Sequence, residues 1–194
     1  MDKCKVLVIF GGRSSEHDIS CKSAVNVIGS MDERKYIIKI IGITKEGKWL
    51  SVDSTEQIKN GEWRKSETEA ILSPDTAHRG ILYIKDGICK KETVDVIFPV
   101  LHGLYGEDGT IQGIFEMAGI PYVGCGVLSS AVSMDKISTK LFADKIGMVQ
   151  ADYVTDLSKG METASKTALA VENKLGYPVF VKPSNAGSSM GVSK

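Results

Sequence analysis

Val6-Leu7-Val8-Ile9-Phe10-Gly11-Gly12 is the stretch of sequence that decides the fold. Its consecutive apolar residues are typical of a parallel strand buried on both faces, and its two glycines predict a tight turn where that strand ends. The apolar stripe over residues 21–28 then predicts a helix, and residues 37–43 predict a second strand. Because a strand, a helix and a strand in this order make a crossover in a parallel sheet, we expect a Rossmann-like opening.

Residues 44–93 are less regular. Glycine-containing turns such as Asp86-Gly87 separate short strands, which we expect at residues 49–52, 70–72 and 80–84. We interpret this part of the chain as a hairpin-rich insertion. Its charged segments are interpreted as a solvated face, namely Trp63-Arg64-Lys65 and Lys90-Lys91.

A second buried-strand pattern covers residues 94–101 and ends at His102-Gly103. Ligands of open α/β sheets bind beside the carboxyl ends of the strands. We therefore expect this loop and the loop over residues 11–18 to lie side by side and to share one crevice. A helix over residues 111–118 and a short strand over residues 121–123 follow.

The composition changes from strand-rich to helical at Gly124-Cys125-Gly126. We expect this segment to be a hinge or boundary between two domains. The first domain, residues 1–123, is predicted to be Rossmann-like, and the second, residues 124–194, to mix helices with strands.

The helices of the second domain follow from caps and periodicity. Asp135 is placed to cap a helix over residues 136–146, and its apolar residues, including Leu141 and Phe142, are predicted to face inward. Another helix is predicted over residues 164–175, where Gly176 stops it.

A strand expected at residues 177–181 leads Lys182 into a loop of small residues that ends near Gly191. Such a loop leaves backbone N–H groups free to hold phosphate oxygens. Glycines and serines are also common in ordinary turns, and the loop has no GxxxxGK[ST] pattern. We favour phosphate binding because a lysine stands at the root of the loop.

Three further residues are candidates for chemistry. Glu16 could pair with an ammonium group or simply favour the start of a helix through the helix dipole. His102 follows a buried strand, where a binding role and a spectator role are both open. Lys136 is interpreted from spacing alone as a surface lysine. The acidic run over residues 106–109 is interpreted as a helix cap rather than a metal site.

The composition narrows the class of protein. The chain has 194 residues, enough for a full core, with 24 basic and 24 acidic side chains. This balance favours neither nucleic acid nor an anionic membrane, and suits a small neutral or zwitterionic substrate. The four scattered cysteines suit reduced thiols, and no signal segment or membrane span is found. We expect a soluble, cytoplasmic protein.

Four motifs in order resemble the D-alanine–D-alanine ligases of the ATP-grasp superfamily. The resemblance covers the whole chain, and a single motif of this kind would be modest support. The motifs are Phe10 to Ser20; Leu101-His102-Gly103 with residues 106–113; Ser133-Met134-Asp135-Lys136 with Lys140; and Val181-Lys182-Pro183-Ser184 with residues 187–191.

The resemblance implies a fold and an activity. The fold would be a Rossmann-like, pre-ATP-grasp parallel-sheet domain followed by a partial α+β ATP-grasp subdomain. The activity would be an ATP-dependent ligation for peptidoglycan precursor synthesis. The carboxylate of the first D-alanine is phosphorylated, and the amine of the second D-alanine attacks the resulting acyl phosphate.

The resemblance also implies roles for single residues. The Glu16 carboxylate would bind the ammonium of the first D-alanine. Ser188 would be hydrogen-bonded to the Glu16 carboxylate, and His102 would lie beside them. Glu16 and Ser188 are thus the expected catalytic residues. The residues expected to bind ATP are Lys136, Lys182, Gly187, Ser188 and Ser189.

Some expectations concern what the given residues leave open. The Mg²⁺ ligands of the family are expected outside this chain, which we interpret as an N-terminal part that is inactive alone. A homodimer is expected, and the second substrate could also be D-lactate or D-serine. A further alternative is a binding or dimerisation module without catalysis. From Ser184 onward we expect irregular or mobile structure, and Asp18 stands where the family commonly has Glu.

Overall fold

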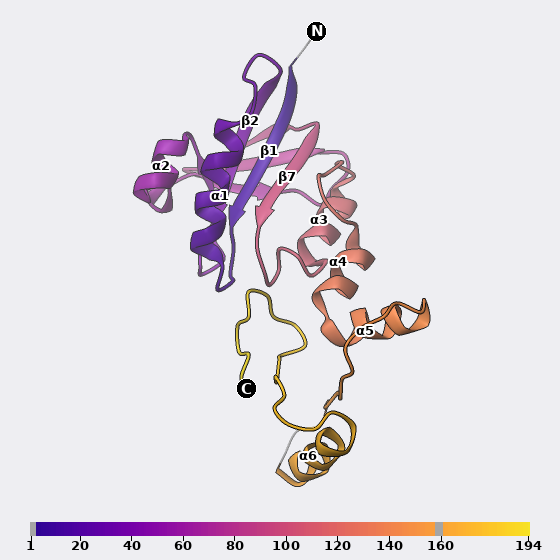
Figure 1. Cartoon of the computed structure of the whole chain (residues 1–194). Coiled ribbons are helices and arrows are strands. Elements are labelled where there is room, and N and C mark those ends of the chain that lie inside the picture. The colour runs from indigo at the N-terminus through magenta and orange to yellow at the C-terminus, as the bar shows by residue number, and fades with distance from the viewer. Residues whose placement is uncertain (1–2, 158–160) are drawn as a thin grey trace. The chain divides into compact units, whose positions relative to one another are not determined.

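The structure is a computed structural model that describes residues 3–157 and 161–194 (Figure 1). The chain separates into two compact units, residues 1–131 and residues 132–194. Each unit is described by itself below. Whether residues 124–126 act as a hinge stays a prediction.

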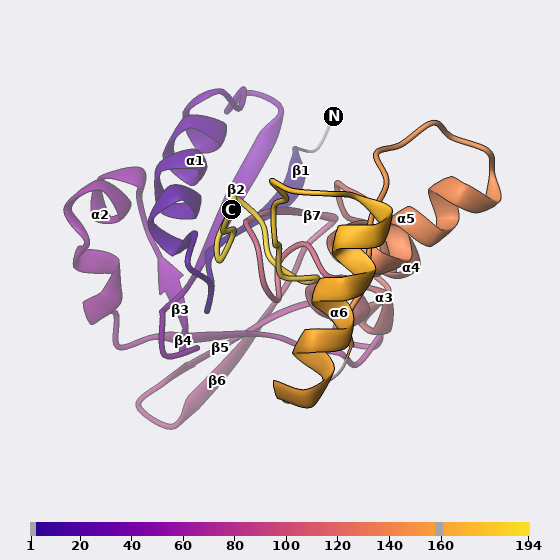
Figure 2. The ribbon, with the colours of Figure 1, turned by 60° about the horizontal axis from the view of Figure 1, so that its bottom comes forward.

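The first unit is built on one seven-stranded sheet with the strand order β6-β5-β4-β3-β2-β1-β7 (Figures 1 and 2). Its strands are β1 (Cys4–Gly11), β2 (Tyr36–Ile43), β3 (Trp49–Val52), β4 (Glu69–Leu72), β5 (Gly80–Lys85), β6 (Ile88–Thr93) and β7 (Val96–Leu101). β1 pairs in parallel with both β2 and β7, which confirms the Rossmann-like opening. The strands from β3 to β6 are antiparallel to their neighbours, so the sheet is mixed rather than purely parallel.

Both faces of β1 are covered. The side chains from Leu7 to Phe10 have no exposed surface. On one face, α1 (His17–Gly29) packs through Ala24 and partly buried apolar neighbours. On the other face, α3 (Thr110–Ala118), the helix predicted over residues 111–118, packs through Phe115 and Ala118 and ends at Gly119 in the left-handed conformation.

Beside the last parallel strand, Tyr122 makes an isolated parallel bridge to Ile97 of β7. The short strand expected at residues 121–123 is therefore reduced to this one bridge.

The insertion extends the sheet as an antiparallel meander. Asp86 and Gly87 both have positive φ angles and turn β5 into β6, so the predicted hairpin signal is confirmed. Three elements of the insertion were not predicted from the pattern: β6, α2 (Thr55–Asn60) and a 3-10 helix, η1 (Glu62–Lys65). α2 lies beside α1 in both views (Figures 1 and 2).

The interpretation of residues 63–65 as a solvated face is wrong for Trp63, which is 1% exposed. Its ring meets Phe10 edge-on at 4.9 Å between centroids. Gly42 makes room for it, since a Cβ at that position would lie 2.5 Å from the indole. A four-residue helix has no periodicity that reveals such packing, so the charges on either side of Trp63 dominated the pattern.

The second unit begins within α4 (Val127–Met134), which crosses the boundary between the units, and continues with α5 (Lys136–Lys145) and α6 (Met161–Lys174). The cap of α5 is as predicted, because Asp135 accepts a hydrogen bond from the Ser138 amide at 2.6 Å. The prediction of an inward apolar face is wrong. Leu141 and Phe142 are 58% and 55% exposed, and Ile146 is 70% exposed. Among the described residues, no element covers this face.

The strand predicted over residues 177–181 is also wrong. Only Val181 pairs, in an isolated antiparallel bridge with Ser193. An extended segment becomes a strand only when a neighbour satisfies its backbone groups along its length, and the described residues supply one position. From Ser184 onward the chain forms turns, as predicted, while its mobility stays a prediction.

None of the helices that the structure describes is long and apolar enough to cross a membrane. All four cysteine thiols are free.

Candidate functional site

The loops that follow β1 and β7 lie side by side, as the strand order requires. Ser14 Oγ in the first loop donates a hydrogen bond to the His102 carbonyl in the second, at 2.7 Å. Further down, the buried Ser20 Oγ accepts from the Gly11 amide at 2.7 Å and donates to the Val100 carbonyl. The expected side-by-side position of these two loops is therefore confirmed, and the two serines join them.

Glu16 is the N-cap residue that precedes α1 and makes no side-chain capping bond to that helix. Its amide donates to Ser14 Oγ at 3.2 Å. A Cβ on Gly103 would lie 2.7 Å from Glu16 Oε2, and Gly103 has a φ of +71°. Gly103 therefore lets the second loop approach the Glu16 carboxylate closely.

His102 is partly buried, and its Nε2 lies 3.2 Å from Ser23 Oγ of α1. The ring thus turns toward α1, on the same side of the sheet as Glu16. The structure brings Glu16 and the His102 loop together, as the sequence predicted. Ser14 and Ser23, which hold that arrangement, were missed because single serines in a loop or on a helix carry no pattern.

The acidic run after β7 has a structural role. Glu107 Oε2 accepts from the Gly103 amide at 2.7 Å, and Asp108 accepts from the amides of Tyr105 and Thr110 at 2.8 and 3.0 Å. Partial burial opposes ionisation of Asp108, but these amides hold its pKa below the ordinary value. Within residues 3–157 and 161–194, no group of three or more His, Cys, Asp or Glu side chains could hold a metal ion.

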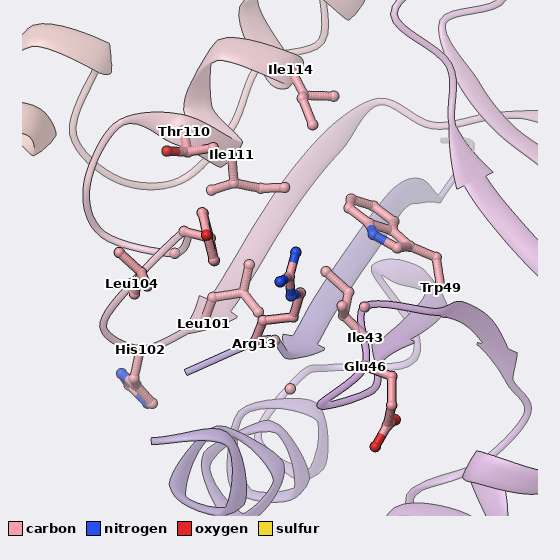
Figure 3. A pocket seen from close by; sticks show the side chains of 15 residues that line it. Arg13, Ile43, Glu46, Trp49, Leu101, His102, Leu104, Thr110, Ile111 and Ile114 are labelled. Atoms are coloured by element: carbon pink, nitrogen blue, oxygen red, sulfur yellow. The ribbon is translucent and has the colours of Figure 1, made fainter. Parts of the chain in front are cut away.

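A pocket of about 250 Å³ lies beside these loops, on the face of the sheet that α3 covers. Figure 3 shows the Arg13 side chain reaching into it between Ile111 and Ile43, with the His102 ring at the rim. The Arg13 guanidinium also lies 5.5 Å from the centre of the Tyr105 ring. The residues that line the pocket are mostly apolar: Gly11, Gly12, Arg13, Ile43, Glu46, Gly47, Trp49, Leu101, His102, Leu104, Tyr105, Gly106, Thr110, Ile111 and Ile114.

The second unit carries the glycine- and serine-rich loop. The Val181–Ser193 bridge closes its base, with hydrogen bonds of 2.8 and 3.0 Å. At its tip the Met190 amide donates to the Gly187 carbonyl at 2.9 Å, and Ser188 and Ser189 between them have φ angles of +47° and +59°. Positive φ angles at two successive serines are strained, and such strain concentrates at ligand-binding loops.

Residues at the start of α5 are hydrogen-bonded to the root of this loop. Asp135 Oδ2 accepts a hydrogen bond from Ser184 Oγ at 2.6 Å, and the Lys136 amide donates to the Ser184 carbonyl at 3.1 Å. The Lys136 ammonium donates to the carbonyls of Ser184 and Ala186. The Ser184 hydroxyl and the Ser138 amide lower the pKa of Asp135, because both hydrogen bonds favour the carboxylate.

The other lysines of this unit have different surroundings. Lys182 is exposed at the root of the loop. Lys140 shares the helix with Lys136 but donates to Gln150 and to the Ala151 carbonyl. The structure thus places Lys136 and Lys182 at the loop and turns Lys140 elsewhere. Whether Lys136, Lys182 and the tip residues 187–189 bind ATP stays a prediction.

Two family models match the chain. One is described as the D-ala D-ala ligase N-terminus and matches residues 5–125, and the other as the D-ala D-ala ligase C-terminus and matches residues 142–194. The D-alanine–D-alanine ligase of Acetivibrio thermocellus is 49% identical over an alignment of 208 positions, which covers 100% of this chain and 55% of that protein. The chain therefore spans about half the length of this relative.

Solved structures agree with these matches. The crystal structure of the VanG D-Ala:D-Ser ligase from Enterococcus faecalis superposes with a TM-score of 0.86 at 39% identity, covering 99% of this chain and 55% of that one. The D-alanine–D-alanine ligase of Bacillus anthracis complexed with ATP gives a TM-score of 0.57 at 27% identity, covering 96% and 49%.

The fold is thus that of a ligase of the ATP-grasp type. The chain belongs to the D-alanine–D-alanine ligase family.

Proposed function

We propose that this chain is the substrate-side part of an enzyme that joins two D-alanine molecules at the expense of ATP. The observation that carries the proposal is the pairing of the Glu16 loop with the His102 loop at the carboxyl ends of β1 and β7. Family membership supplies the reaction class. The whole reaction is proposed for the whole enzyme, since the chain spans about half of its relatives.

In this proposal the first unit holds the first D-alanine. The Glu16 carboxylate pairs with the substrate ammonium, and His102, fixed by Ser23, stands beside it. The substrate is a zwitterion, so a single well-placed carboxylate orients it without a strongly charged surface. Ser188 is the proposed partner of Glu16 in the catalytic network.

The second unit contributes to ATP binding. The proposed contacts are the ammonium groups of Lys136 and Lys182 and the loop over residues 187–189. When bound, ATP supplies the phosphoryl group that activates the carboxylate of the first D-alanine. Lysines and backbone amides neutralise negative charge, which would otherwise repel the carboxylate from the phosphate.

Further parts of the proposal concern Mg²⁺, compartment and assembly. The described residues do not form a cluster that fits Mg²⁺, so we assign it no ligand in this chain. Free thiols and use of ATP suit the cytoplasm. A homodimer is proposed by resemblance to the family.

A chimera tests the function directly. Residues 1–194 replace the matching half of the Acetivibrio thermocellus ligase, and phosphate release is measured with ATP, Mg²⁺ and D-alanine. We expect D-alanine-dependent release, about a hundredfold or more slower in Glu16→Gln because a substrate-orienting charge is lost. Residues 1–194 alone are expected to release none. A folded chimera whose phosphate release does not depend on D-alanine would overturn the proposal.

A second candidate is the ligation of D-alanine to D-serine. It is favoured by the likeness to the VanG D-Ala:D-Ser ligase. The same chimera, supplied with D-serine or D-lactate beside D-alanine, distinguishes these candidates by the dipeptide or depsipeptide that forms.

A further inference from the structure

His17 is a buried imidazole that has no part in the proposed reaction. It lies in the first turn of α1 and has no exposed surface. Its Nδ1 lies 2.8 Å from the Gly12 carbonyl, and Arg64 Nη2 lies 3.3 Å from its Nε2. A carbonyl only accepts and a guanidinium only donates, so Nδ1 carries the proton and Nε2 is bare. Its neighbours therefore select one neutral tautomer.

His17 holds the backbone of the Glu16 loop, residues 11–18, which is called the substrate loop below. Gly11 and Gly12 have φ angles of +89° and +94°. Glycine loses more conformational entropy than other residues when its backbone is fixed. The Gly12 amide is held by the Ile43 carbonyl at 2.8 Å, and its own carbonyl by His17. These two bonds fix the peptide groups on either side of the Gly12 Cα, at the start of the loop that leads to Glu16.

The groups that hold His17 come from the insertion. The Trp63 ring stacks on the imidazole at 6.1 Å between centroids, with an angle of 24° between the ring planes. Arg64 lies 4.8 Å from the Trp63 ring and reaches Asp18 at 4.0 Å. Lys45 also pairs with Asp18, at 3.0 Å. Residues far along the sequence thus fix one imidazole behind the loop.

We propose that His17 is a positioning residue for the substrate loop, and that Trp63 and Arg64 of the insertion hold it in the tautomer that binds the Gly12 carbonyl. The proposal rests on the proposed function only where it names D-alanine as the ligand of this loop. His17 lies behind the loop, so it acts by ordering the Glu16 backbone before binding. Preorganisation of this kind lowers the entropy that binding must overcome.

The test begins with the 194-residue chain and needs no activity. Long-range ¹H–¹⁵N spectra should show a protonated Nδ1 and a bare Nε2 on His17. In Arg64→Met the share of the Nε2-protonated tautomer should rise above its wild-type level, because Nε2 no longer accepts a hydrogen bond from the guanidinium while the Gly12 carbonyl still favours a proton on Nδ1. An Nε2-protonated ring in the wild type would overturn the proposal.

Hydrogen exchange and D-alanine titration complete the test. In His17→Leu, amide exchange over residues 12–16 should rise about tenfold while that of β1 does not change, as expected for the loss of one hydrogen bond. His17→Asn keeps a donor near Nδ1 and should remain close to wild type. D-Alanine affinity of the chimera should follow the same order, falling about tenfold in His17→Leu.

The outcomes separate the two proposals. Unchanged loop exchange in a folded His17→Leu, or equal loss in Leu and Asn variants, overturns the positioning role. If the amides of β1 also exchange faster in His17→Leu, that variant disturbs more than the loop. The exchange over residues 12–16 in His17→Asn and Arg64→Met then decides whether His17 positions the loop. If the wild-type chimera does not bind D-alanine, the proposed function fails, while the tautomer and exchange data still decide the role of His17.

Discussion

The two units of this chain are stabilised by different kinds of interaction. Among the residues that the structure describes, every buried apolar side chain lies between Val6 and Ile120. In residues 132–194, Leu141 and Phe142 of α5 are exposed, and hydrogen bonds join Asp135 and Lys136 to the loop at Ser184. The first unit therefore has a packed core that supports the Glu16 loop. In the second unit, hydrogen bonds from Asp135 and Lys136 to Ser184, here called the clasp, hold the loop over residues 182–192.

This difference has a consequence for function. The Glu16 loop is held from behind by buried groups, so it is ordered before any ligand binds. The loop over residues 182–192 is held at its root and strained at its tip, so its conformation depends on a few exposed hydrogen bonds. Loops that close over ligands are drawn from the less stable parts of a protein.

The largest expected effect compares two phenylalanines. Phe115→Ala empties a fully buried site and should lower the free energy of unfolding by about 3–5 kcal/mol. Phe142→Ala removes a ring that is 55% exposed and should change it by no more than about 0.5 kcal/mol. Urea unfolding followed by circular dichroism measures both. Equal losses would show that the second unit hides a core of its own.

The packing of the first unit is tested by adding atoms as well. Gly42→Ala places a methyl group 2.5 Å from the Trp63 ring and should destabilise the chain by about 1–3 kcal/mol. The matched control is Gly113→Ala in α3, where a Cβ meets nothing within 4 Å, and a gain of up to about 1 kcal/mol is expected. A Gly42→Ala chain as stable as wild type would contradict the tight packing of Trp63.

The clasp of the second unit is tested at Asp135. Asp135→Ala removes the cap of α5 and the acceptor of Ser184, so we expect a loss of about 1 kcal/mol in the local stability of this unit. Exchange of the amides over residues 182–193 should speed up accordingly. Asp152→Ala, at an exposed position, is the control and should leave this exchange unchanged.

The same carboxylate predicts a pH dependence. The pKa of Asp135 is lowered in the folded chain, so its contribution is complete above the unfolded value of about 3.9 and is lost as the pH falls through the lower folded pKa. Loop protection should therefore fall in acid for the wild type, and the Asp135→Ala chain should lack this step. A loop whose protection rises on acidification would contradict the assignment.

The smallest effect is expected at the tip of the loop. Ser189 has a φ of +59°, so Ser189→Gly should relieve strain and stabilise the local turn by about 0.5–1 kcal/mol. Ser193→Gly, at a position without a positive φ, should stabilise nothing. Thermal unfolding, together with loop exchange, measures both variants. A destabilised Ser189→Gly would mean that the hydroxyl contributes more than the strain costs.

The sequence predicted the long periodic elements well. β1, α1, β2 and α3 follow from apolar runs and stripes, and the pairing of the Glu16 and His102 loops follows from the order of parallel strands. The buried position of Trp63 could not be predicted, because it depends on a space that Gly42 leaves in a strand distant in the sequence. The exposure of Leu141 and Phe142 was missed for the converse reason, since an apolar stripe predicts a covered face without naming what covers it.

The site was predicted in part for a similar reason. Glu16, His102 and Lys136 stand in recognisable motifs, and the structure places each at a loop. Ser14, Ser20 and Ser23 each make a hydrogen bond that joins segments far apart in the sequence. Only the geometry reveals such bonds, because one serine has no period and no motif.

Hydrogen exchange of the wild-type chain, resolved by residue, tests the contrast between the two units most directly. Amides of β1, β2 and β7 should exchange only by global unfolding. Amides of α5 and α6 should exchange at least about a hundredfold faster, by local opening of a unit in which the described side chains form no buried apolar core. Equal protection of α5 and β1 would contradict the account.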